Sequence, residues 1–74
     1  MTRTIPRSVA RCLVGAKLYA VLAHTPERYE TVLVEPEGVK LFRKREGRRV
    51  TWGVYGYAHD GSDLRRALAR CGGR

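Results

Sequence analysis

The sequence predicts an α+β fold: a small antiparallel β-meander of three to five strands with one C-terminal α-helix packed on one face. Apolar and polar residues alternate over residues 39–58 on both sides of Glu46-Gly47, which is typical of a β-hairpin. Apolar residues then recur at helical spacing over residues 62–71. A chain of 74 residues has room for one domain with a modest core, so we expect residues 1–74 to form a single small basic domain.

The N-terminal third fits more than one structure. Residues 1–8 contain Arg3, Pro6 and Arg7, and we expect a flexible basic arm there. Residues 9–24 fit either a helix that Gly15 interrupts or two strands that break at that glycine. The β-branched and aromatic residues of 17–24 favour a strand.

The next segment predicts a turn followed by a second strand. Residues 25–28 favour a type I turn with Pro26 in its second position, although they also fit a helix start capped by Thr25. A strand is then expected over residues 28–35, and Pro36-Glu37-Gly38 ends it.

The hairpin around Glu46-Gly47 can be paired residue by residue. A two-residue turn at this dipeptide would place Leu41 opposite Trp52. It would also place Lys44 opposite Arg49 and Arg45 opposite Arg48, two like-charge pairs that an external anion would relieve. Because side chains alternate along a strand, one face is apolar and the other carries rings and cations. The predicted core-facing set is Val39, Leu41, Val50, Trp52 and Val54.

Residues 60–73 predict a capped amphipathic helix. We expect Ser62 to cap its N-terminus, Asp63 to favour its positive end and Gly72-Gly73 to end it. This helix would cover the apolar face of the hairpin with Leu64, Ala67, Leu68 and Cys71.

The cysteines and histidines predict neither a disulfide framework nor a metal site. The chain has two cysteines, Cys12 and Cys71, and we expect both to be buried thiols. No Cys or His pair has the close spacing of zinc ligands, so no metal or other cofactor is expected. We expect no catalytic residues and no enzyme activity, because no nucleophile–base arrangement or phosphate-binding loop is recognisable.

The N-terminal half also bears on location. Residues 12–23 are apolar after a basic stretch, as in a secretory signal, but Lys17 interrupts them. Twelve residues are too few to span a bilayer. We therefore expect a cytoplasmic protein with no membrane partner.

The charge distribution indicates a polyanion-binding surface. Fifteen Lys and Arg residues against seven Asp and Glu residues give a formal net charge of +8. Six of these bases, but only one acid, fall within residues 39–59, where aromatic residues interleave with them. The candidate nucleic-acid-binding residues are Lys40, Phe42, Lys44, Arg45, Arg48, Arg49, Tyr55 and Tyr57.

The pattern therefore predicts a small non-catalytic protein that binds DNA or RNA, with cations on phosphates and rings against bases. Phe42, Tyr55 and Tyr57 also fit a buried core, which would leave only a rim of arginines. An alternative function is an interaction or inhibitor protein that docks on an acidic surface of a partner protein or enzyme. A subunit of a ribonucleoprotein or capsid is a third, and exposed edge strands make a homodimer plausible.

At the level of architecture alone, the predicted fold resembles crenarchaeal chromatin proteins and the arm-binding domains of tyrosine recombinases. No residue pattern accompanies this resemblance, so it implies a fold and assigns no role to any residue.

Overall fold

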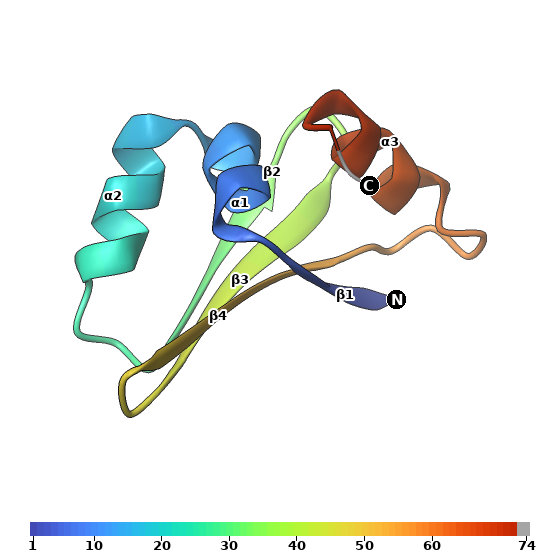
Figure 1. The fold of residues 1–74 in the computed structure, drawn as a ribbon. Coiled ribbons are helices and arrows are strands. Elements are labelled where there is room, and N and C mark those ends of the chain that lie inside the picture. The colour runs from blue at the N-terminus through green and yellow to red at the C-terminus, as the bar shows by residue number, and fades with distance from the viewer. Residues whose placement is uncertain (73–74) are drawn as a thin grey trace.

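A computed structural model describes residues 1–72 as one antiparallel sheet with three helices on one side (Figure 1). The strand order is β1-β4-β3-β2. The predicted α+β class, with its C-terminal helix on one face of the sheet, is confirmed, and two further helices join it. The elements are β1 (Thr2–Ile5), α1 (Arg7–Val14), α2 (Ala16–His24), β2 (Tyr29–Val34), β3 (Val39–Glu46), β4 (Arg49–Tyr55) and α3 (Ser62–Arg70).

The core lies between the sheet and the helices. Val39, Leu41 and Val54 are fully buried on the helix-covered face, and Trp52 is 2% exposed. The helices add Val9, Ala10, Leu13, Leu22, Leu64, Ala67 and Leu68. This arrangement confirms four of the five residues predicted to face the core. Val50 is 37% exposed, because it lies next to the β3–β4 turn, away from the end of the sheet that α1 and α3 cover.

Residues 1–24 differ from the predictions. The expected flexible arm contains an edge strand, β1, whose Ile5 pairs with Trp52. Residues 9–24, where 17–24 favoured a strand, are helical, and Gly15 separates α1 from α2 with a φ of +89°. The glycine changes the helix direction, so no single apolar stripe runs through the segment. Residues 25–28 connect α2 to β2 without helix, which excludes a helix beginning at Thr25.

The β3–β4 turn lies one residue later than predicted. Gly47 and Arg48 form the loop, and Glu46 pairs with Arg49. Gly47 has a φ of +62°, which matches the need of a type II′ turn for glycine in its first central position. Every cross-strand partner therefore moves by two residues, so that Leu41 faces Val54 and Phe42 faces Gly53. A shift of two residues leaves each side chain on its predicted face.

The ends of α3 agree with the prediction in part. Gly61, with a φ of +73°, is the N-cap, and Ser62 is the first helical residue, so the predicted serine cap is wrong. A glycine caps here because the chain must turn through the left-handed region. Gly72 has a φ of +66° just after the helix, as expected of a C-terminal stop, and Gly73 lies outside the described residues.

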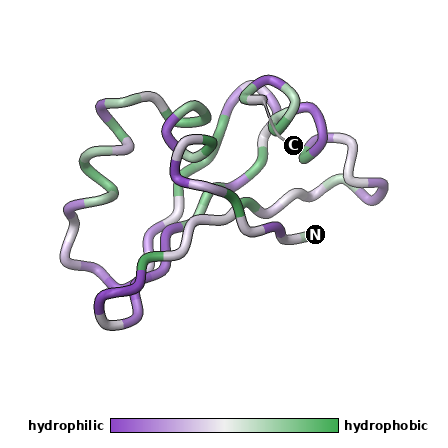
Figure 2. Tube along the Cα trace, viewed as in Figure 1, coloured by the Kyte–Doolittle hydropathy of each residue, from purple (hydrophilic) through white to green (hydrophobic). Residues whose placement is uncertain are grey.

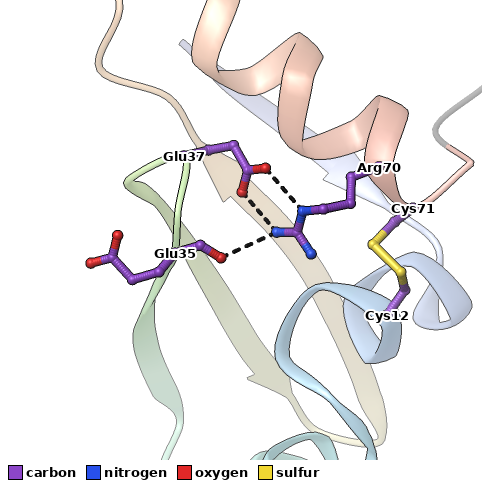
Figure 3. Close-up of a disulfide and its surroundings, with 5 residues drawn as sticks. All are labelled: Cys12, Glu35, Glu37, Arg70 and Cys71. Carbon is purple, nitrogen blue, oxygen red and sulfur yellow. Dashed lines mark hydrogen bonds and ion pairs between the residues drawn. A yellow bond between two sulfur atoms is a disulfide. The ribbon is translucent and has the colours of Figure 1, made fainter.

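A disulfide joins Cys12 in α1 to Cys71 at the end of α3 (Figure 3). The prediction of two buried thiols is therefore wrong, and Cys12 lies at the exposed surface. The two cysteines are 59 residues apart in sequence, and they meet because α1 and α3 lie side by side on the sheet. Next to this bond, Arg70 binds both carboxylate oxygens of Glu37 at 2.9 and 2.7 Å and donates to the Glu35 carbonyl.

Candidate nucleic-acid interface

The face of the sheet opposite the helices, here called the open face, carries the predicted rings. In residues 1–72 no helix lies on this side (Figure 1). Tyr29, Tyr55 and Tyr57 are 57%, 43% and 59% exposed, and Phe42 is half-buried. The alternative in which Phe42, Tyr55 and Tyr57 form part of the core is therefore excluded.

Phe42 occupies space that only a glycine leaves free. In the observed register Phe42 pairs with Gly53 of β4. A Cβ atom on Gly53 would overlap three atoms of the Phe42 ring. The ring therefore lies over the backbone of β4, and the missing side chain lets it approach the sheet closely.

The rings form two pairs, and all four rings line one hollow. Tyr29 and Phe42 lie nearly parallel, with an angle of 17° between their planes and 6.0 Å between their centroids. Tyr55 and Tyr57 meet edge to face at 5.0 Å, a favourable aromatic geometry. The hollow has a volume of about 460 Å³ and is lined by Thr2, Tyr29, Thr31, Lys40, Phe42, Tyr55 and Tyr57. Tyr29 was not among the predicted residues, because only the β2–β3 register brings it beside Phe42.

Three of the predicted cations lie on the open face. Lys40 lines the hollow, Lys44 pairs with Tyr29 of β2, and Arg49 pairs with Glu46 near the turn. Lys44 pairs with Thr51 across the sheet, and its Nζ lies 3.8 Å from Oε1 of Glu46. The expected pairing of Lys44 with Arg49 is therefore absent, because the turn is displaced. The like-charge strain that was expected to call for an external anion does not exist at these positions.

Two of the predicted cations occupy other places. Arg48 lies in the β3–β4 turn, a largely hydrophilic part of the chain in Figure 2. Arg45 lies on the helix-covered face, where its Nη2 donates to the Ala23 carbonyl at 3.1 Å. Its neighbour Arg43 is fully buried on that face and donates to the Glu27 carbonyl. The predicted set of eight thus divides, and six of its residues belong to the open face.

Asp63 fixes the segment that carries Tyr57, a role that the sequence did not reveal. Its Oδ2 accepts hydrogen bonds from the backbone N–H groups of Tyr57 at 2.8 Å and Ala58 at 3.0 Å. Its Oδ1 accepts from the Leu64 N–H at 2.7 Å. Burial raises the pKa of Asp63, but these three donors outweigh it, so the pKa lies below its ordinary value. The charged carboxylate therefore holds the chain that leaves β4.

Other kinds of site find little support in the described part of the chain. Among residues 1–72, no group of three or more His, Cys, Asp or Glu side chains is placed to hold a metal ion. Within the same range, no helix has the length and apolar character needed to cross a membrane. No family model, curated protein or solved structure matches this chain.

Proposed function

We propose that this chain is a non-catalytic nucleic-acid-binding protein whose ligand lies on the open face of the sheet. The observation that carries the proposal is the hollow lined by the two ring pairs, whose lining includes Lys40 and, within residues 1–72, no carboxylate. Exposed rings stack on bases, and ammonium and guanidinium groups bind phosphates. The net charge of +8 adds a long-range attraction for any polyanion.

In this proposal the residues of the open face and of the adjoining β3–β4 turn have separate tasks. Phe42, Tyr55 and Tyr57 contact bases or sugars, and Tyr29 joins them beside Phe42. Lys40, Lys44, Arg48 and Arg49 contact phosphates. Arg45 takes no part, since its guanidinium is bonded on the helix-covered face.

A salt titration tests this proposal. Fluorescence anisotropy of labelled DNA and RNA should give affinities that fall with salt at a log–log slope near −3, as expected when about four cations meet phosphates. Lys40→Ala should weaken binding and reduce the slope by about 1. Lys17→Ala is the matched control, because Lys17 is an exposed lysine of α2 on the other side of the sheet. An affinity that stays constant between about 50 and 300 mM salt would contradict the proposal.

An acidic protein surface is the competing partner, and one observation favours it. Arg7, Arg11, Arg65 and Arg66 are exposed on the helices, where a ligand on the open face does not reach them. A protein of this kind would elute with a partner polypeptide and carry no nucleic acid. Nucleic acid retained through purification and released by high salt would favour our proposal.

Homodimerisation and a cytoplasmic location stay predictions. The disulfide between Cys12 and Cys71 favours an oxidising compartment instead of the cytoplasm, because stable disulfides are rare in reducing compartments.

A further inference from the structure

We infer that the ligand of the open face is single-stranded nucleic acid, and that one of its bases enters the hollow lined by the two ring pairs. This inference rests on the function proposed above and narrows it. It follows from which parts of a nucleic acid the rings can reach, from the chemistry of the lining, and from the width of the sheet.

The rings require a base whose flat surface is free. Tyr29, Tyr55 and Tyr57 are each more than two-fifths exposed. Tyr29 and Tyr55 lie on the sheet surface, and Tyr57 follows β4 and lines the same hollow. In a duplex each base is already stacked on both sides, so these rings could meet only the terminal pairs. In a single strand the bases can turn outward and stack on aromatic side chains.

The hollow is large enough to admit a base, and its lining suits one chemically. Its volume of about 460 Å³ lies within the range of about 300–1,000 Å³ that is usual for small-ligand sites. The Thr2 and Thr31 hydroxyls can donate to or accept from the edge of a base. Lys40 is half-buried in the same lining and can neutralise the adjoining phosphate, and in the described part of the chain no lining carboxylate opposes it.

The part of the sheet that carries the rings is too wide to enter a groove of a duplex. Here β1 pairs with β4, β4 with β3, and β3 with β2, which gives three strand spacings. At about 4.8 Å each, these spacings place the outer strands about 14 Å apart before any side chain is counted. The major groove of B-DNA is about 12 Å wide. Only the two-stranded tip, residues 45–50, is narrow enough, and it carries Arg48 and Arg49 instead of rings.

The test compares the hollow with the tip. Anisotropy titrations would use labelled oligothymidine and oligouridine, a duplex of equal length, and a heparin fragment, which is a polyanion without bases. We expect both single strands to bind at least about tenfold more tightly than the duplex at equal salt. Tyr55→Leu should weaken single-strand binding roughly tenfold and leave heparin binding unchanged. The double variant Arg48→Ala, Arg49→Ala should weaken the binding of all four ligands.

Leu33→Ala is the matched control, because Leu33 is 55% exposed on the same face and does not line the hollow. Thermal unfolding verifies that each variant folds, and Tyr57→Leu replaces Tyr55→Leu if that variant does not fold. Equal affinity for duplex and single strand, or unchanged single-strand binding in Tyr55→Leu, overturns this inference while nucleic-acid binding stands. If none of the nucleic acids binds at about 50 mM salt, the proposed function fails as well.

Discussion

The two ends of the helix-covered face are held in different ways. At one end α1 and α3 pack on Val39, Leu41 and Val54, all fully buried, and a disulfide joins the two helices. At the other end α2 contributes one buried residue, Leu22, and stacks Tyr19 on Trp52. Leu18 and Val21 of α2 are 36% and 64% exposed. The helix nearest the hairpin turn thus has the smallest share of the core.

Arginine side chains replace apolar contacts beneath the C-terminal end of α2. Arg43 is fully buried and donates to the Glu27 carbonyl, and Arg45 donates to the Ala23 carbonyl. Within residues 1–72, Nε and Nη1 of Arg43 and Nε of Arg45 have no hydrogen-bond partner. A buried guanidinium with unpaired donors costs free energy. The hydrogen bonds to the Glu27 and Ala23 carbonyls therefore fix the position of the C-terminal end of α2 more than they stabilise the fold. We therefore expect the α2 end to open before the α3 end.

Loss of the disulfide should have the largest effect and would reduce the difference between the two ends. The bond joins residues separated by 59 positions in the sequence. Because it restricts the unfolded chain, it should add about 4 kcal/mol to the free energy of unfolding. The Cys12→Ser, Cys71→Ser variant should lose that amount in urea denaturation. Reduced wild-type protein is the control and should behave like the variant. Equal stability of the oxidised and reduced forms would show that the bond does not hold the α3 end.

Substitution of Arg43 probes the α2 end. Arg43→Met removes the unpaired donors and keeps most of the side-chain volume, so it should raise the free energy of unfolding by about 1 kcal/mol. Arg43→Ala leaves a cavity and should lower it by about 2 kcal/mol. Urea denaturation of the two variants separates the effects of charge and volume. If Arg43→Met destabilises as much as Arg43→Ala, the bond to the Glu27 carbonyl outweighs the cost of burial.

Acid should act selectively on the α3 end, with the smallest effect. Hydrogen bonds from Arg70 lower the pKa of Glu37, and hydrogen bonds from Ser62 lower that of Asp60. The pKa of Asp63 is lowered as well. A carboxylate with a lowered folded-state pKa stabilises the fold above its unfolded value, near 4, and this stabilisation disappears as the pH falls through the folded value.

Amide NMR spectra recorded between about pH 6 and pH 2 can follow this change. Signals of α3 should shift or broaden at a higher pH than signals of α2. Glu37→Gln should reduce the pH dependence around α3, and added salt should do the same because the Glu37–Arg70 pair is partly exposed. Earlier loss of the α2 signals would contradict the selective effect of acid on the α3 end.

The strands and their faces could be predicted because alternation depends only on whether a position is odd or even. The displaced turn changed every partner, yet Phe42, Tyr55 and Tyr57 stayed on the face assigned to them. The prediction of two like-charge pairs was wrong because the identity of each cross-strand partner depends on which residues form the turn. Glycine in the first loop position of a type II′ turn was the signal that would have placed the loop at Gly47-Arg48.

The N-terminal helices and the disulfide could not be predicted in the same way. Two helices of eight and nine residues, separated by Gly15, give no continuous apolar stripe, and their helical state depends on packing against the sheet. Two cysteines so far apart show no spacing pattern, and only the placement of α1 beside α3 joins them. Arg45 was among the predicted binding residues, but its bond to Ala23 depends on the helical alternative for residues 9–24, which the sequence did not favour.

Phe42 and Gly53 share one space on the open face, so the side-chain volumes at these two positions are coupled. A larger residue at 53 would displace the ring, and a smaller residue at 42 would expose the backbone of β4. Neither position can therefore change freely by itself, and a library that varies them together should recover paired exchanges of large for small. The shape of the open face thus depends both on the Phe42 ring and on the absence of a side chain at Gly53 opposite it.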